Sequence, residues 1–376
     1  MITEEQKKQF RLKGYDIVFE RNAKVFAVNS KDVCNWSEEK REDFSKATGL
    51  QIFHERDGNL VFYDPEYFEQ ELTHLHYIGT ATHGIPQPIN CHFMHRLFYN
   101  CEQIYELDLS DWDVSDVINM DSMFFGCKYL KRVDVANWDV SNVSTFYAMF
   151  MHCTSLEEID VHAWSFESAS TLDSMFMNCE SLKKFSAPDK HAPRLTTLDF
   201  MFSWCTGLQE IDMHNWDTPS LVSISEMCSN CSSLKSVDFS GLNVTNVSNF
   251  DFAFQKCFAL QSADFKTWSP KCACTTIEMF YECKSLKQAL LPNWGESTIT
   301  QAREMFCNCD SLEVLDMPNT ALTERALTEK MFANCDALQK KLGIPWQSLP
   351  EALRMSIWQE KMREVPTSTG LEKISF

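Results

Sequence analysis

Neither a membrane span nor an export signal is apparent in this sequence. No apolar run approaches the roughly 18 residues that a membrane-spanning helix needs, and residues 1–8, MITEEQKK, lack the apolar stretch of a secretory signal. We therefore expect a cytoplasmic protein with no membrane insertion. Export as an adhesin or host-directed effector, by a route that needs no cleavable leader, is the alternative.

Common enzyme motifs are missing as well. The sequence holds no glycine-rich phosphate loop, no Gly-x-Ser-x-Gly and no His-Glu-x-x-His. We expect no catalysis, no cofactor and no catalytic or metal-ligating residues. A metal-binding or enzymatic N-terminal unit is kept as an alternative, because several potential ligands lie close together in the sequence: His74, His76, His83, Cys91, His92 and His95. Their spacing matches no familiar zinc pattern of two tight ligand pairs.

Positive charge is scarce. The chain has 34 Lys and Arg against 53 Asp and Glu, which gives a formal net charge of −19 and an isoelectric point near 4.9. Such a field repels nucleic-acid backbones and anionic membranes, both of which bind clusters of Lys and Arg. The electrostatically favoured partners are basic proteins or cations, and we expect no binding of nucleic acid.

What the chain does have is a strict period of 26 residues. It is carried by ten cysteines, here called the cysteine ladder: Cys101, Cys127, Cys153, Cys179, Cys205, Cys231, Cys257, Cys283, Cys309 and Cys335. A constant period without insertions is typical of a solenoid, in which each coil stacks on its neighbour. Equivalent cysteines of stacked coils point the same way, so we expect reduced thiols in the core rather than disulfides.

One period predicts the structure of one coil. The segment from Phe146 to Cys153 has apolar residues at i, i+3, i+4 and i+7, which predicts a short helix. Ile159-Asp160-Val161 alternates apolar and acidic residues, which predicts a short strand with Asp160 pointing outward. Trp164 then begins a return loop. The predicted fold class is an α/β solenoid of about ten coils, each with a short helix and a strand that pairs in parallel with the next coil.

These segments carry a resemblance to a known repeat. Residues 130–150, LKRVDVANWDVSNVSTFYAMF, resemble the BspA-like leucine-rich repeat, and the resemblance extends over about residues 93–346. This repeat occurs in bacterial and protist surface proteins and in mycoplasma lipoproteins. The resemblance implies a curved leucine-rich-repeat solenoid that serves adhesion or protein recognition.

The two ends lack the repeat and are expected to cover the solenoid, 91–346, because open ends of a repeat array need caps. Residues 1–90 read as a small α/β unit, with strands around a turn in 15–28, a hairpin in 51–63 centred on Asp57-Gly58, and a helix over 37–47. The alternative for this unit is an independent recognition domain. Residues 347–376 are expected to hold a capping helix over 349–365 and a tail.

A column of carboxylates is the candidate binding site. The outward strand position holds aspartate in most coils, and histidine follows it by two residues in two of them. The candidate partner-binding residues are Asp108, Asp134, Asp160, His162, Asp212, His214, Asp238 and Asp264. Carboxylates about 5 Å apart repel by roughly 1 kcal/mol in water, so a basic protein segment would be favoured there. The alternative is a structural carboxylate, solvated or hydrogen-bonded to a neighbouring coil. His162 and His214 lie two coils apart, near 10 Å, so we do not expect them to share a metal.

Overall fold

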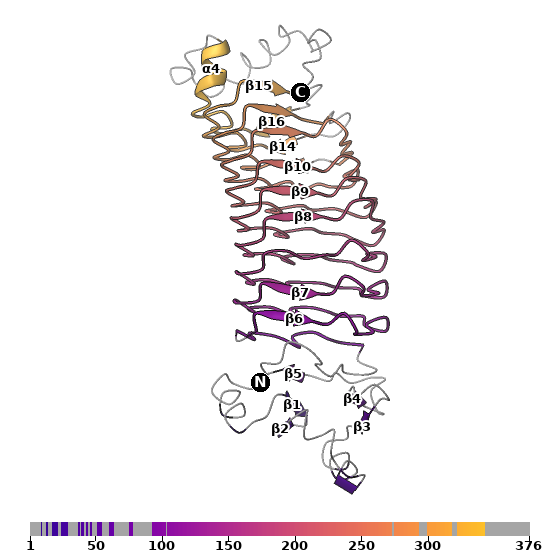
Figure 1. Ribbon diagram of the computed structural model, residues 1–376. Helices are drawn as coiled ribbons and strands as arrows, with labels where there is room; N and C mark the ends of the chain where they lie inside the picture. Colours follow the sequence, from indigo (N-terminus) through magenta and orange to yellow (C-terminus); the bar gives the residue numbers. More distant parts are fainter. Residues whose placement is uncertain are drawn as a thin grey trace.

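The computed structural model describes residues 92–342 except 103, 273, 293–298 and 318–321. Before residue 92 it describes 17–21, 24–28, 51–54, 60–63, 75–77 and single residues between 9 and 46. From residue 92 onward the chain winds as stacked coils with the same parallel backbone pairing from coil to coil (Figure 1). The predicted solenoid is therefore confirmed, while the exact number of ten coils stays a prediction.

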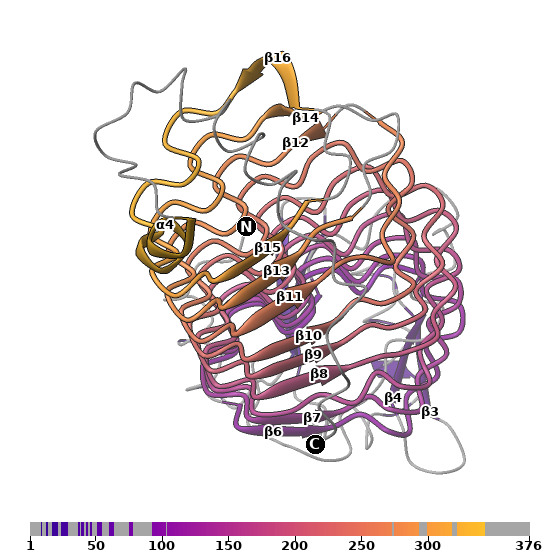
Figure 2. The ribbon, with the colours of Figure 1, turned by 90° about the horizontal axis from the view of Figure 1, so that it is seen from above.

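One side of the stack is formed by short parallel strands from successive coils (Figure 2). They are β6 (Glu106–Asp108), β7 (Arg132–Asp134), β8 (Lys184–Ser186), β9 (Glu210–Asp212), β10 (Ser236–Asp238), β11 (Ser262–Asp264), β13 (Gln288–Leu290) and β15 (Val314–Asp316). Pairing joins β6 to β7, then β8, β9 and β10, then β11, β13 and β15. Within each pair the coils are in register, so that Asp108 lies beside Asp134 and Asp212 beside Asp238.

The strands differ from the prediction in two details. Each begins one residue earlier than the apolar-acidic-apolar pattern indicates, although the predicted alternation holds: Leu107 and Leu109 are buried and Asp108 is exposed. The coil with Ile159-Asp160-Val161 forms no regular strand, which corrects the prediction there. Val161 is still buried and Asp160 still faces solvent, so the alternation survives without the strand.

A second line of parallel contacts runs up another side of the coils. Single bridges link Phe93 to Asn119 and continue coil by coil to Thr275. There they pass into β12 (Cys274–Thr275), which is followed by β14 (Ile299–Gln301) and β16 (Leu322–Leu327) in one parallel sheet. Backbone bonding between coils is thus not confined to the strand side.

The predicted helix in each coil is wrong. In the segment around Met149, the N–H of Phe150 donates to the Met175 oxygen of the next coil at 2.8 Å, while Met149 N–H donates to Phe146 O at 3.1 Å. Residues thus alternate between bonds across coils and tight turns within the coil, and Ala148 adopts a left-handed φ of 53°. A helix is about 10–12 Å wide, whereas the coils lie about 4.8 Å apart, so stacked helices would not fit. We call this segment of each coil the turn arc.

The absence of helices from the described turn arcs has a consequence for shape. Because the strand side and the turn arc both bond directly from coil to coil, neither side wedges the coils apart. The coils stack as a nearly straight column (Figure 1), not as the curved solenoid that the resemblance implies. Within residues 92–342, the described part holds one α-helix, α4 (Asp336–Leu342), after the last ladder cysteine. The capping helix expected over 349–365 lies outside the described residues.

The core is built from ladders of identical side chains. All ten ladder cysteines are buried, as predicted, and the described cysteines form no disulfide. Phenylalanine rings stack from coil to coil, with Phe98, Phe124 and Phe150 at centroid distances of 5.1 and 5.0 Å. The recurring tryptophans are buried too, and the indole of Trp164 donates to the carbonyl oxygen of Val135 at 2.9 Å. The ladder side chains therefore repeat similar contacts from coil to coil, except where Cys228 replaces a phenylalanine and where Lys190 and Leu242 replace a tryptophan.

The N-terminal segments form small antiparallel sheets. β1 (Ile17–Arg21) pairs with β2 (Lys24–Val28) and with β5 (Leu75–Tyr77), while β3 (Gln51–His54) pairs with β4 (Leu60–Tyr63). Both predicted hairpins are confirmed. Glu39 and Lys40 are helical and the hydroxyl of Ser37 accepts the Lys40 N–H at 3.3 Å, as expected for a helix beginning there. The role of residues 1–90 as a cap of the solenoid stays a prediction. The described residues include no helix long and apolar enough to cross a membrane.

Candidate functional site on the strand face

Two columns of outward side chains run up the strand face, and they carry charge differently. The first column alternates in sign over five coils: Glu106, Arg132, Glu158, Lys184 and Glu210. Arg132 pairs with Glu158 at 2.9 Å and Lys184 with Glu210 at 3.3 Å. These pairs are exposed and each contributes little stability, but they relieve the repulsion that like charges in register would cause.

The second column is the predicted acidic one, and it is not balanced in this way. We call Asp108, Asp134, Asp160, Asp212, Asp238 and Asp264 the acidic column. Among the residues that the structure describes, no Lys or Arg nitrogen lies within 4.0 Å of the carboxylates from Asp134 to Asp264 in this set. Lys266 is the basic side chain nearest in register, and it pairs at 3.2 Å with Asp316, which holds the same outward strand position two coils after Asp264. Negative charge therefore accumulates along the column.

Each column aspartate also has a structural task. Its Oδ1 accepts the backbone N–H two residues later, at 2.9 Å from His162 to Asp160 and 3.0 Å from Ser240 to Asp238. This Asx turn ends the strand and favours Asp over most other residues. These bonds run within one coil, not to the neighbouring coil as the structural alternative expected, except that Ser186 Oγ donates to Asp212 Oδ2 at 3.3 Å.

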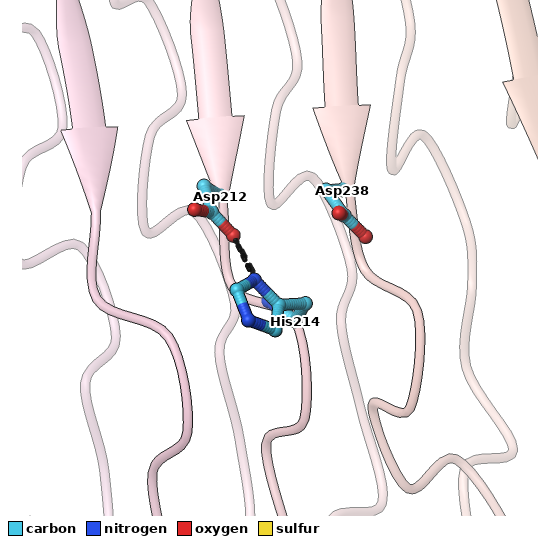
Figure 3. Close-up of side chains that lie close together, drawn as sticks. All are labelled: Asp212, His214 and Asp238. Carbon is cyan, nitrogen blue, oxygen red and sulfur yellow. Dashed lines mark hydrogen bonds and ion pairs between the residues drawn. The ribbon is translucent and has the colours of Figure 1, made fainter.

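Three of the eight predicted site residues come together at the ends of β9 and β10. One ligand atom from each of Asp212, His214 and Asp238 lies within 4.8 Å of the others (Figure 3). The imidazole Nδ1 of His214 lies 2.6 Å from Asp212 Oδ1, and its Nε2 lies 3.8 Å from Asp189 Oδ2. The remaining predicted residues are distributed along the column, with Asp108 and Asp134 in register but far from this cluster in the stack.

In this cluster the histidine and the carboxylates each stabilise the charged form of the other. The hydrogen bond to Asp212 raises the pKa of His214 above its ordinary value, and the negative charges of Asp212, Asp189 and Asp238 raise it further. Partial burial acts in the opposite direction. Partial burial works to raise the pKa of the Asp212 carboxyl, but the bonds from His214 outweigh it and the pKa is lowered. Protonated His214 therefore stabilises the neighbouring carboxylates.

His162 occupies the same repeat position as His214 but has different surroundings. Its backbone N–H donates to Asp160, as His214 does to Asp212 at 3.3 Å. The next coil, however, places Ser186 where the other cluster has Asp238. The two histidines are consequently not equivalent, although the sequence pattern alone treats them alike.

Two residues of this region, Lys190 and Asp189, are not among the predicted site residues. Lys190 stands where the tryptophan recurs, is only 9% exposed, and its ammonium donates to the His162 carbonyl oxygen at 2.5 Å. Burial lowers the pKa of Lys190, and the charges of Asp160 and Asp189 oppose that shift. The interruption of the tryptophan ladder was the signal in the sequence that could have identified it.

The alternative metal site near the N-terminus is not tested by the structure. His74, His83 and Cys91 lie outside the described residues, as does the side chain of His76. His92 is described, and its Nδ1 lies 2.8 Å from the backbone oxygen of Asp116. A metal site there stays an alternative raised by the sequence alone.

A protein-family comparison matches most of the solenoid. Residues 90–189, 196–318 and 249–356 match the family described as "Mycoplasma protein of unknown function, DUF285". The chain belongs to this family. The match supports a repeat protein of the general kind expected, whereas the narrower BspA-like class remains a resemblance. No curated protein matches the sequence.

Solved structures give only a distant likeness. A chain in the "Crystal structure of TLR13-ssRNA13 complex" is 19% identical with a TM-score of 0.36, and the match covers 61% of this chain and 31% of that one. A leucine-rich-repeat protein of Leptospira interrogans is 14% identical with a TM-score of 0.24, covering 59% and 62%. This chain thus spans less than two thirds of either protein. At such scores, neither likeness bears on what this protein binds.

Proposed function

We propose that the protein is a non-catalytic recognition scaffold that binds a basic segment of a protein partner along the acidic column. The observation that carries the proposal is the contrast between the two outward columns of the strand face. In one column acidic and basic residues alternate and form ion pairs with each other. The other, two residues further on, places like charges in register at coil spacing. Lys and Arg side chains of a partner would relieve that repulsion.

Such an interface would depend strongly on electrostatics. Exposed carboxylates attract a basic partner over roughly 8–10 Å at physiological ionic strength, and salt weakens this attraction. We therefore expect association to be fast at low salt and to slow as salt rises. The rigid stacking of the coils fixes the spacing of the charges, so the partner would be selected by where its own basic residues lie.

The test is a capture experiment from source-cell and candidate host lysates. One variant carries Asp134→Asn, Asp160→Asn and Asp238→Asn, which remove three charges but keep the oxygen that accepts the Asx-turn bond. The matched control carries Glu106→Gln, Glu158→Gln and Glu210→Gln, which remove the same charge from the alternating column. The list of captured proteins is compared among wild type and both variants by mass spectrometry.

We expect a partner that wild type and the glutamine control retain and the asparagine variant loses. Equal loss in both variants would show attraction to net charge alone and would contradict a defined site on the column. Retention by both would place the site elsewhere, on the turn arc or the N-terminal unit. Circular dichroism and thermal melting of each variant establish that the loss does not reflect unfolding.

The location of the protein is part of the same proposal. We infer a cytoplasmic scaffold, supported by the reduced cysteines of the core, which suit a reducing compartment. Fractionation of the source cells tests this. Recovery of the protein from the culture supernatant or from inside a host cell would instead favour the exported adhesin or effector.

A further inference from the structure

The cluster at the ends of β9 and β10 combines one imidazole with two carboxylates on a rigid frame. Asp212 and His214 come from one coil and Asp238 from the next (Figure 3). The parallel pairing of β9 with β10 holds Asp212 directly beside Asp238. We propose that Asp212, His214 and Asp238 bind a divalent first-row transition-metal ion. This inference does not rest on the proposed function, because it requires no protein partner.

The spacing of the ligand atoms is close to what such an ion requires. Nitrogen and oxygen ligands bind these ions at about 2.0–2.2 Å, so two ligands of one ion lie up to about 4.2 Å apart. The three ligand atoms lie within 4.8 Å of one another. Binding would therefore require a small shift of the ligand atoms, and Asp238, whose Oδ1 accepts hydrogen bonds from Ser240, is the most exposed of the three residues. Three protein ligands leave the other positions of the ion to water, as in open metal sites.

The surroundings of His214 orient it for this role. Nδ1 is hydrogen-bonded to Asp212 Oδ1 at 2.6 Å, so the ion would take the place of the proton between these two ligand atoms. The opposite ring nitrogen, Nε2, faces Asp189 Oδ2 at 3.8 Å. A carboxylate beyond the second ring nitrogen is the usual partner of a metal-bound histidine, because it fixes the ring and raises its basicity. Asp189 is held in turn by Asn215, whose Nδ2 donates to Asp189 Oδ1 at 2.9 Å.

The charge balance also favours a cation. With a neutral imidazole the carboxylates of Asp189, Asp212 and Asp238 bring three negative charges together, and the Lys190 ammonium offsets part of the charge of Asp189. No Lys or Arg nitrogen of the described residues lies within 4.0 Å of Asp212 or Asp238. A mixed nitrogen and oxygen ligand set suits manganese, iron, cobalt or zinc in the divalent state, whereas thiolates are preferred by copper(I) and zinc.

The same chain supplies a natural comparison two coils earlier. A shift of 52 residues turns Asp212, His214 and Asp238 into Asp160, His162 and Ser186, and turns Asp189 into Asn137. His162 therefore keeps one carboxylate from its own coil but lacks the second ligand and the carboxylate behind the ring. The repeat places a histidine at both positions and completes the ligand set at only one of them.

Manganese is the probe, because the many cysteines of this chain compete poorly for it. The full chain is freed of metal with a chelator, kept reduced with a phosphine, and titrated with Mn²⁺ by calorimetry and by electron paramagnetic resonance of the free ion. Four proteins are compared: wild type, Asp238→Ser, His214→Ser and His162→Ser. Asp238→Ser introduces the residue that this repeat position already has at Ser186, so folding should persist.

We expect one saturable Mn²⁺ per wild-type chain, at least tenfold weaker binding by Asp238→Ser and by His214→Ser, and unchanged binding by His162→Ser. Absence of saturable binding by wild type would overturn the proposal. So would equal affinities of wild type and Asp238→Ser, or an equal loss in His162→Ser, since the ion would then be attracted by the column as a whole. Each result stands whether or not a protein partner is found.

Discussion

The thiol of Cys153 donates a hydrogen bond of 3.1 Å to the carbonyl oxygen of Phe124, 29 residues earlier in the chain. The same bond recurs along the ladder, for example at 3.0 Å from Cys205 to Phe176. Alanine could not donate, and serine would bring a more strongly hydrated hydroxyl into an apolar core. Cysteine is small and apolar yet still carries a weak donor. The ladder is thus explained by packing and hydrogen bonding, without disulfide or redox chemistry.

The reactivity of the thiols follows directly. In the native protein we expect the ladder cysteines to resist Ellman's reagent, because they are buried and protonated. Cys272, which is partly exposed, is the described cysteine most open to reaction. After denaturation without reductant, nearly all sixteen thiols of the chain should react. A clearly lower titre in the denatured protein would reveal disulfides and contradict the reduced core.

Stability should fall in alkali. Burial raises the pKa of Cys283 to about 12, and that of Cys179 and Cys205 well above the usual range. In an unfolded chain cysteine ionises near pH 8.5. The folded protein then retains protons that the unfolded chain releases, so the stabilisation is complete below about pH 8.5 and declines as the pH rises toward the folded pKa.

Urea unfolding between pH 7.5 and 10.5, in the presence of a phosphine reductant, measures this decline. Well above the unfolded pKa of about 8.5, each buried thiol contributes a slope of about 1.4 kcal/mol per pH unit, whereas below it the slope is close to zero. The control is Cys283→Ala, which should be less stable at pH 7.5 but show a slope smaller by one thiol's share. An identical slope in the variant would mean that other groups cause the loss.

Trp204 is the second target for mutation. It is 49% exposed and adopts a left-handed φ of 62°, a conformation that costs most side chains roughly 1–2 kcal/mol. The equivalent positions of other coils hold residues that tolerate it well, including Asn178 and Gly126. We expect Trp204→Asn to raise the free energy of unfolding by about 1 kcal/mol, measured by chemical denaturation.

Tyr147→Asn is the control for that experiment. Tyr147 is equally exposed, at 49%, but is absent from the residues with left-handed φ. Removing it should give no comparable gain in stability. If Trp204→Asn were destabilising, contacts of the indole would outweigh the backbone strain, and Trp204 would have a packing role.

Much of the fold could be predicted because each coil repeats the same physical constraints. The cysteine at the position of Cys153 must be buried in each coil in which it occurs. Asp160, between Ile159 and Val161, must face solvent. The period therefore identified the core and the outward column before any contact was known. The helix was wrongly predicted because overlapping turns and a helix both place apolar residues at similar spacing. Only the short distance between stacked coils excludes the helix, and the sequence of a single coil does not determine that distance.

The candidate site could be predicted only in part, for a different reason. Asp212 and Asp238 follow from the register, because equivalent residues of paired strands must lie side by side. Asp189 approaches His214 from the preceding coil's return loop, where no column pattern applies. Its contribution depends on side-chain directions that the spacing of residues does not fix. The sequence therefore predicted Asp212, His214 and Asp238 as separate candidates, and only the three-dimensional structure shows that they form a cluster.

The interruption of the tryptophan ladder leads to a last prediction. Lys190 donates to the His162 carbonyl oxygen from a largely buried position, near the carboxylates of Asp160 and Asp189. Lys190→Met keeps the apolar stem but leaves that oxygen without its donor and the carboxylates without a nearby positive charge. We expect the free energy of unfolding at pH 7 to fall by about 1–3 kcal/mol. Lys184→Met is the control, because Lys184 forms an exposed ion pair with Glu210 and its loss should cost less than about 1 kcal/mol. If Lys190→Met lost no more stability than this control, the cost of burying the ammonium would nearly cancel the stabilisation from its hydrogen bond and charge. If the variant were more stable than wild type, that cost would be the larger of the two.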